Sequence, residues 1–238
     1  YPWLIAVIFG VAVFNTFLNN YRWLLLLKGQ NIDTDVKETL PLTFIGLFFN
    51  FAMPGSVGGD VIKAYYVAQM HKAQGLIPSK TPSPRVRAVT SVLMDRVVGL
   101  YAMSMIALVA VIVNWSVLKD IAHLRALGIF IFAVFFGFTG FLILGFSRQV
   151  RGHNLTNKIF KYMPMGKNFE KLYDAIHSFT NGKAQFAFGV VLSLVVQSLN
   201  VMMFYVAAQA LHYQNITLGS FFFIIPVGLI ATAIPISP

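Results

Sequence analysis

Residues 88–115 have the sequence AVTSVLMDRVVGLYAMSMIALVAVIVNW. A helix needs about 20 predominantly apolar residues to cross the hydrocarbon of a bilayer, and this run exceeds that length. Its only charged side chains are the neighbours Asp95 and Arg96. The run therefore predicts a membrane-spanning helix that carries two ionisable groups within or at the edge of the hydrocarbon.

Further apolar stretches flank this run, at residues 3–27, 36–53, 61–71, 124–146, 186–211 and 218–234. Composition agrees, because 57% of the residues are hydrophobic and 11% are charged, whereas soluble domains carry about a quarter charged residues. We predict an all-α polytopic membrane protein, a helical bundle forming a single transmembrane domain over residues 1–238. Both ends of the chain lie within apolar sequence, and we expect it to be a fragment of a longer protein.

The polar connectors differ in charge. Residues 63–87 hold five basic and no acidic side chains, and residues 148–183 hold seven basic and two acidic ones, whereas residues 116–125 and 212–217 are nearly neutral. Cytoplasmic loops of membrane proteins carry an excess of Lys and Arg. We therefore expect a cytoplasmic linker at residues 73–84, and a basic cytoplasmic segment with an interfacial helix at 148–183.

The formal net charge of +10 does not indicate nucleic-acid binding. A nucleic-acid-binding domain gathers Lys and Arg on one face of a soluble fold, whereas here they lie between apolar runs. That placement suits anionic headgroups, so we expect membrane lipids as partners and no nucleic acid. The chain has no cysteine, no histidines at metal-ligand spacing and no catalytic motif. We therefore expect no metal and no other cofactor.

The segment 36–71 is interrupted by the sequence PGSVGGD at residues 54–60. Non-helical backbone at membrane depth is tolerated only where protein or water surrounds it, so this break is a candidate site. Two topologies agree with the charge pattern. The segment either crosses the membrane once, or it dips in and returns as a re-entrant hairpin of Gly/Pro-broken helices.

The glycine-rich break also has two interpretations. The free amides of Gly55, Gly58 and Gly59, with Lys63 one helical turn later, could hold a phosphate group. Alternatively, the glycines only turn the chain and Asp60 caps the following helix. Both interpretations can hold together.

A candidate inverted repeat relates the two ends of the chain. The sequence LKGQNI at residues 27–32 resembles LHYQNI at 211–216, and each follows a long apolar run and precedes a Gly-Leu pair. If segment 36–71 is re-entrant, the two repeat halves have opposite orientations. Interrupted segments in inverted halves are typical of a transport site. Short matches also arise by chance in apolar sequence, so the repeat is a hypothesis.

Charged side chains at membrane depth are the strongest site candidates. Asp95 lies about 12 Å along the helix from Arg87, and each such charge costs a few kcal/mol or more unless it meets a partner or water. Asp95 and Arg96 either form an internal ion pair that locks helices together or line a cavity for a polar lipid headgroup. Arg22 either joins that cavity or snorkels to the interface.

In chain order, Arg22 with the following Trp, Asn50, the PGSVGGD stretch, the basic loop and the Asp95-Arg96 pair resemble the lysylphosphatidylglycerol synthase transmembrane (flippase-like) family. The resemblance covers nearly the whole chain. It implies a multi-pass protein of the cytoplasmic (inner) membrane that translocates aminoacylated phospholipids or polyprenyl-linked lipids. It also implies that aminoacyl transfer resides in a separate soluble domain, so a membrane or soluble transferase is an expected partner.

Two functional hypotheses follow. The first is a flippase-like transporter that moves an anionic or aminoacylated phospholipid, or a polyprenyl-phosphate-linked lipid, across the cytoplasmic membrane. The second is the membrane part of a lipid-modifying enzyme of the phosphatidylglycerol lysyltransferase type, or an accessory to a lipid-linked glycosyltransferase. The residues expected to bind the lipid headgroup or its phosphate are Arg22, Asn50, Gly55, Gly58, Gly59, Asp60, Lys63, Arg87, Asp95 and Arg96.

Engineered cysteines test the predicted topology, because the native chain has none. An impermeant thiol reagent added to intact cells should label Lys119→Cys and Gln214→Cys, which are expected outside. Pro78→Cys and Asn157→Cys should be labelled only after permeabilisation, because the basic connectors are expected in the cytoplasm. Labelling of Asn157→Cys in intact cells would overturn the assignment.

Overall fold

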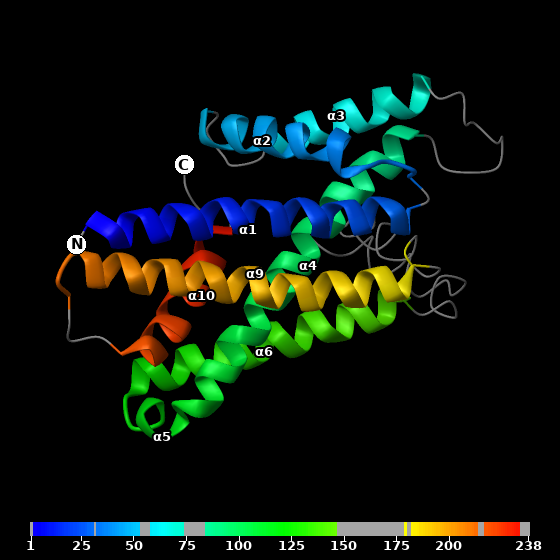
Figure 1. Ribbon diagram of the computed structural model, residues 1–238. Helices are drawn as coiled ribbons and strands as arrows, with labels where there is room; N and C mark the ends of the chain where they lie inside the picture. Colours follow the sequence, from blue (N-terminus) through cyan, green and yellow to red (C-terminus); the bar gives the residue numbers. More distant parts are fainter. Residues whose placement is uncertain are drawn as a thin grey trace. The chain divides into compact units, whose positions relative to one another are not determined.

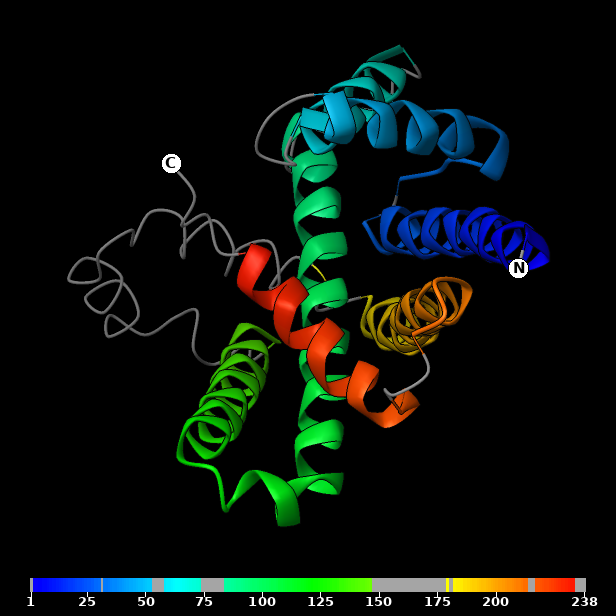
Figure 2. The ribbon, with the colours of Figure 1, turned by 90° about the vertical axis from the view of Figure 1, so that its left-hand side faces the viewer.

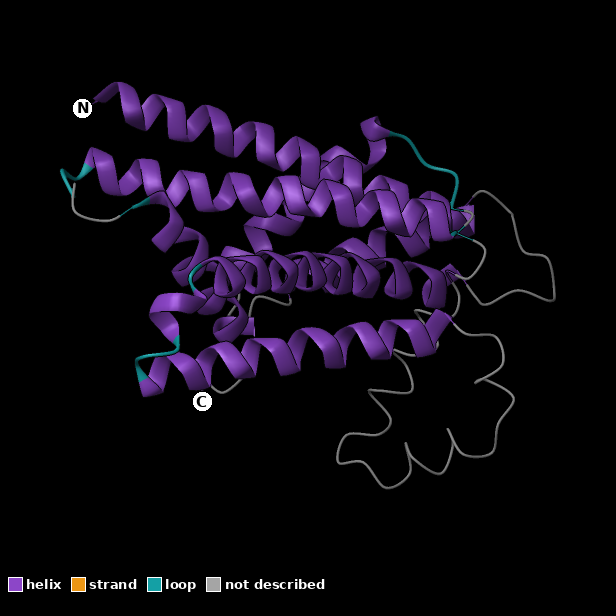
Figure 3. Ribbon diagram, turned by 90° about the horizontal axis from the view of Figure 1, so that it is seen from below, coloured by secondary structure: helices purple, strands orange, loops and turns teal. Residues whose placement is uncertain are grey.

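The computed structural model describes residues 2–30, 32–52, 58–73, 84–146, 179, 182–213 and 217–233. These residues form α-helices joined by short turns, and no strand occurs among them (Figure 3). The all-α prediction is confirmed. The chain divides into two units, which are unit 1 (Tyr1–Asn19, Val98–Thr139 and Val190–Pro238) and unit 2 (Asn20–Val97 and Gly140–Gly189).

Among the described residues, four helices are long and apolar enough to cross a membrane (Figure 1). They are α1 (Pro2–Gly29), α4 (Pro84–Val113), α6 (Ala122–Phe146) and α9 (Lys183–Ala210). At 25 to 30 residues each, they extend about 38–45 Å, more than the roughly 30 Å of a hydrocarbon core. They match the apolar runs expected from the sequence to within a few residues.

Large apolar side chains cover much of the outer surface of these helices. Examples are Phe9, Val113 and Ile143, which are all largely exposed. A soluble domain rarely exposes contiguous apolar surface of this kind, whereas lipid tails are a favourable solvent for it. The exposed faces therefore agree with a membrane setting.

The start and end of α4 differ from the predicted helix at residues 88–115. The helix begins four residues earlier, at Pro84, and proline suits a first helical position because the N–H it lacks would have no helical partner there. It ends at Val113, and the next residue, Asn114, donates to the Ala110 carbonyl from both its backbone N–H, at 3.1 Å, and its side chain, at 2.8 Å. A short unpredicted helix follows, α5 (Trp115–Leu118).

The broken segment forms a helical hairpin. Helices α2 (Val36–Ala52) and α3 (Gly58–Ala73) lie side by side and run in opposite directions (Figures 1 and 2). At 17 and 16 residues, each extends about 25 Å, which is shorter than the hydrocarbon core. The hairpin returns the chain to the end of the pair at which it began, as a re-entrant segment requires.

Close packing at two glycines holds this hairpin together. A Cβ atom at Gly59 would overlap the Gly46 carbonyl oxygen, so α2 and α3 can approach this closely only without side chains there. The Gly59 N–H donates to the Asn50 Oδ1 at 2.9 Å. Asn50 therefore satisfies a free amide in the first turn of α3.

The roles predicted for the glycine-rich break need correction. Helix α3 begins at Gly58, so Gly58, Gly59 and Asp60 lie within its first turn and not before it. The capping contact comes from Asn50, and the Asp60 carboxylate binds Arg96 instead, so the predicted cap at Asp60 is wrong. Gly55 lies outside the described residues.

Helix lengths agree with the candidate repeat. The 28-residue α1 precedes the 17-residue α2, and the 28-residue α9 precedes the 16-residue α10 (Leu218–Ala233). Each short helix contains one internal proline, Pro41 or Pro226. The relative orientation of the repeat halves stays a prediction.

Two predicted features lie mainly outside the described residues. They are the cytoplasmic linker, residues 74–83 of which are not described, and the interfacial helix within 148–183. Phe179 is described, and it is fully buried against Gly29 at the end of α1. This contact anchors the chain just before α9 to the end of α1 within unit 2.

The boundaries between the two units fall within the long helices. In α4, α6 and α9, the ends that adjoin the basic segments 63–87 and 148–183 belong to unit 2. Their other ends, which adjoin the nearly neutral turns, belong to unit 1. By the charge rule, unit 2 contains the ends that are expected to face the cytoplasm.

The hairpin predicts the side of the membrane from which a reagent reaches the start of α2. Asp33→Cys, at an exposed position before α2, should react with an impermeant thiol reagent from the same side as Pro78→Cys. Lys119→Cys serves as the control for the opposite side. Labelling of Asp33→Cys together with Lys119→Cys would show that residues 36–71 cross the membrane once.

Candidate functional site

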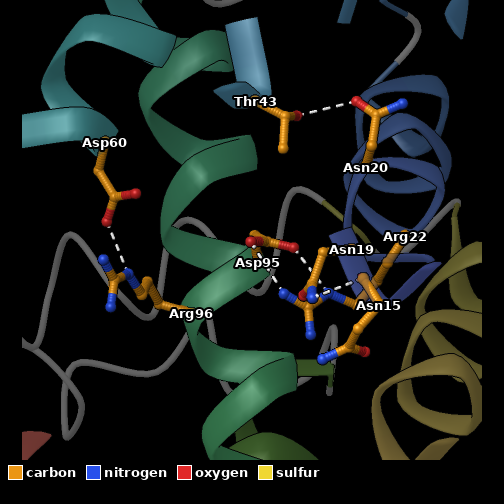
Figure 4. A network of polar contacts seen from close by, with 8 residues as sticks. All are labelled: Asn15, Asn19, Asn20, Arg22, Thr43, Asp60, Asp95 and Arg96. Atoms are coloured by element: carbon orange, nitrogen blue, oxygen red, sulfur yellow. Dashed lines mark hydrogen bonds and ion pairs between the residues drawn. The ribbon is translucent and has the colours of Figure 1, made fainter. Parts of the chain in front are cut away.

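The centre of unit 2 is a two-point ion pair between α1 and α4. The Arg22 Nε donates to the Asp95 Oδ1 at 2.8 Å, and its Nη2 donates to Oδ2 at 3.1 Å (Figure 4). The exposed fractions of the two side chains are 8% and 19%. Arg22 is therefore buried, and the interpretation that it snorkels to the interface is wrong.

A second ion pair joins the next residue of α4 to α3. The Arg96 Nε donates to the Asp60 Oδ2 at 2.6 Å (Figure 4). Here 49% of the Arg96 side chain is exposed, against 17% for Asp60. Neighbouring residues on a helix do not face each other. Asp95 and Arg96 accordingly bind different helices, and the predicted ion pair between them is wrong.

Lys63 lies one turn after Asp60 on α3, next to both pairs. Its aliphatic stem packs against Gly46, where a Cβ would come within 3.2 Å of the Lys63 Cγ and Cδ. Its Nζ lies 5.0 Å from the centroid of the Trp23 ring, a cation–π distance. The charges of Asp60, Asp95, Arg22 and Arg96 all act on this ammonium group.

Two donors in this cluster have no acceptor among the described residues. The Lys63 ammonium forms neither a hydrogen bond nor an ion pair with any described residue. Trp23 is 1% exposed, and its indole N–H likewise has no described hydrogen-bond partner. Three cationic side chains and two carboxylates leave the cluster with one net positive charge. An anion would provide hydrogen-bond acceptors for both donors and a negative charge to balance the cluster.

A buried hydroxyl–amide contact helps to place the hairpin. The Thr43 Oγ1 donates to the Asn20 Oδ1 at 2.9 Å, and both side chains are buried (Figure 4). It ties α2 to α1 two residues before Arg22. An apolar core packs around this contact. Its buried residues, among those that the structure describes, are Trp23, Leu27, Ile32, Leu42, Ala64, Val67, Ala68, Ala88 and Val92.

Five of the residues predicted for the site are brought together here: Arg22, Asp60, Lys63, Asp95 and Arg96. Asn50 and the two glycines at the start of α3 shape the hairpin instead. Arg87 is partly buried and forms no ion pair with a described residue. Sequence reasoning missed Asn20 and Thr43, which carry no motif signal, and it used Trp23 for the family resemblance without placing it in the site.

Comparison with known proteins identifies the family of this chain. A family model described as Lysylphosphatidylglycerol synthase TM region matches residues 1–238. The chain belongs to this family. No curated protein and no solved structure matches it.

Membership confirms the family resemblance and, together with the four long apolar helices, a multi-pass membrane protein. In this lysylphosphatidylglycerol synthase TM region protein, ionisable groups of unit 2 gather around the hairpin. No three His, Cys, Asp or Glu side chains of the described residues cluster so that they could hold a metal ion. Among the described residues, the cluster consists of two Arg–Asp ion pairs and the ammonium group of Lys63.

The two ion pairs should differ in their effect on stability. Asp95→Leu removes the carboxylate from the buried Arg22 and should destabilise the fold by about 3–5 kcal/mol. Asp60→Leu should cost less, because Arg96 is half-exposed and exposed pairs contribute about 0–1 kcal/mol. Thermal unfolding in detergent measures both.

The control for this comparison is the double variant Arg22→Leu/Asp95→Leu. It replaces the buried pair by apolar groups and should recover much of the stability lost in Asp95→Leu. An unfolding temperature of Asp95→Leu equal to that of the wild type would contradict the buried pair.

Proposed function

We propose that this protein is a lipid transporter of the flippase type. Its substrate would be an anionic phospholipid or a polyprenyl-phosphate-linked lipid, moved across the cytoplasmic membrane. The observation that supports it most is the pair of buried or half-buried donors without described acceptors, the Lys63 ammonium and the Trp23 N–H, in a cluster with one net positive charge. A phosphate group of the lipid would provide oxygens for both.

The carboxylates have a distinct part in this proposal. Asp95 holds Arg22 and Asp60 holds Arg96 at hydrogen-bond distance, so the two guanidinium groups are already largely compensated. A cluster of three uncompensated cations would bind a phosphate very tightly in a low-dielectric setting. Partial compensation leaves Lys63 as the main attractive charge, and it keeps binding weak enough for release, as transport requires.

The surroundings of the cluster also favour a lipid phosphate. Helices α2 and α3 are too short to cross the hydrocarbon (Figure 1), and broken, re-entrant helices are typical of transport sites. Unit 2 adjoins both basic connectors. Lys and Arg near the cytoplasmic surface attract anionic lipids, which raises their local concentration beside the cluster.

The rival hypothesis, a lipid-modifying enzyme, has less support from the side chains. A general base needs a carboxylate or imidazole that is free to take a proton. In the described part of unit 2, the carboxylates of the cluster, Asp60 and Asp95, are both engaged with Arg. Chemical modification of the lipid is better assigned to a transferase partner.

Removal of the Lys63 charge tests the proposal. Wild-type protein in liposomes should accelerate translocation of a fluorescent phosphatidylglycerol. Lys63→Gln should slow it about 10–100-fold, because hydrogen bonds to charged groups contribute about 1.5–3 kcal/mol. The matched control is Lys28→Gln, at an exposed position near the end of α1, which should leave the rate unchanged.

The translocation rate of fluorescent phosphatidylcholine, whose headgroup has no net charge, should change little in Lys63→Gln. Both variants are compared at equal amounts of protein that elutes as a single species from size-exclusion chromatography. Equal phosphatidylglycerol rates for Lys63→Gln and the wild type would refute the phosphate-binding role of Lys63. No acceleration by the wild type would refute the transporter.

A further inference from the structure

Unit 1 contains a chain of three side-chain amides that links α1 to α9. The Asn15 Nδ2 donates to the Asn200 Oδ1 at 2.7 Å, and the Asn200 Nδ2 donates to the Gln197 Oε1 at 3.0 Å. Asn15 lies about 20 Å along α1 from its first residue, Pro2. Such a position is near the middle of a membrane-spanning helix.

The amide chain ends on a buried acceptor that nothing described satisfies. Asn15 is 5% exposed, and its Oδ1 has no hydrogen-bond donor among the described residues. Figure 4 shows Asn15, whose backbone carbonyl accepts a hydrogen bond from the Asn19 side chain. At the other end, Gln197 makes no hydrogen bond through its Nε2 with any described residue.

The order of the three amides decides what can satisfy both ends. Each amide has one acceptor and one donor group, so three in series leave one acceptor end and one donor end unused. The result does not depend on which atom of each amide is assigned as oxygen and which as nitrogen. Exchanging the two atoms in all three amides only moves the unused acceptor to one end of the series and the unused donor to the other. A hydroxyl group both donates and accepts, and it therefore fits either end. A carboxylate or an ammonium group fits only one.

The stretches of α1 and α9 that carry these amides offer no charged side chain to pair with a charged group of a ligand. Residues 2–19 of α1 and 190–210 of α9 contain no Asp, Glu, Lys or Arg. A charge placed among them would have no counter-ion from these helices, which is costly at membrane depth. Unit 2 differs in this respect, because its unsatisfied groups are donors in a cluster with net positive charge.

We propose that the amides of Asn15, Asn200 and Gln197 form a second binding site, whose ligand is an uncharged hydroxyl group of a lipid headgroup, such as that of a glycerol or a sugar. An interhelical clamp explains the Asn15–Asn200 bond. It does not explain why a buried acceptor is left over at Asn15. The site is defined by binding, so it stands whether or not the protein translocates lipid.

The experiment compares two lipids that differ only in hydroxyl groups. Dioleoyl-phosphatidylglycerol and dioleoyl-phosphatidylpropanol carry the same phosphodiester charge, but the second has no headgroup hydroxyl. Dissociation constants are obtained with the whole chain in detergent from the rise of the unfolding temperature with lipid concentration. The wild type should bind phosphatidylglycerol about three- to tenfold more tightly, the effect of a neutral hydrogen bond or two.

Asn15→Leu should abolish this preference and leave the affinity for phosphatidylpropanol unchanged. Asn200→Leu breaks the interhelical bond but keeps the Asn15 amide, so it should retain a preference although it also loses the clamp. Asn19→Leu is the matched control, because among the described residues the Asn19 side chain forms a hydrogen bond only within its own helix, to the Asn15 carbonyl. It should behave like the wild type.

Equal binding of the two lipids by the wild type would overturn the proposal, as expected if the amides hold only water or act only as a clamp. So would an unchanged preference in Asn15→Leu. Failure of the phosphate site gives a different result. Lys63→Gln should weaken both lipids by the same factor and leave their ratio intact, so the two proposals are tested separately.

Discussion

A charge inside a membrane must meet a partner, and in unit 2 the two-point contact between Arg22 and Asp95 is where this requirement is strictest. Arg22 is 8% exposed, so it has little access to water, and a charge at membrane depth without compensation costs several kcal/mol. The contact joins α1 to α4, and Asp60 adds α3 by binding the next residue of α4, Arg96. Three helices are thereby linked through two adjacent positions of one helix.

The hairpin of α2 and α3 makes this arrangement sterically accessible. Gly46 lies against both Gly59 and the stem of Lys63, so α3 approaches α2 closely enough to bring Lys63 over the Trp23 ring. Larger side chains at these glycines would separate the helices. The glycine-rich sequence thus has a packing role, and the charge of Lys63 comes from the helix that this packing positions.

The polar groups left without described partners distinguish the two units. In unit 2 they are donors, the Trp23 N–H and the Lys63 ammonium, and in unit 1 the buried one is an acceptor, the Asn15 Oδ1. Buried polar groups rarely remain unsatisfied in folded proteins. We propose an anion as the ligand in unit 2, where the cluster has net positive charge, and a hydroxyl group as the ligand in unit 1.

The membrane class, the four long helices, the break before α3 and five members of the charged cluster could all be predicted from the amino-acid sequence. Length and hydropathy suffice for these, because lipid permits only helices of a certain length and a charged residue within such a helix is easily recognised as a site candidate. The partners of these residues could not be predicted and came from the fold. Asp95 and Arg96 are neighbours in sequence, yet the turn of a helix directs them to α1 and α3. Packing likewise decides which polar atoms have a hydrogen-bond partner and which have none among the described residues. This applies to Asn15, Asn20, Trp23 and Thr43. Hydrogen-bond partners far apart in sequence depend on which helix faces meet, and a hydropathy pattern contains no information on that.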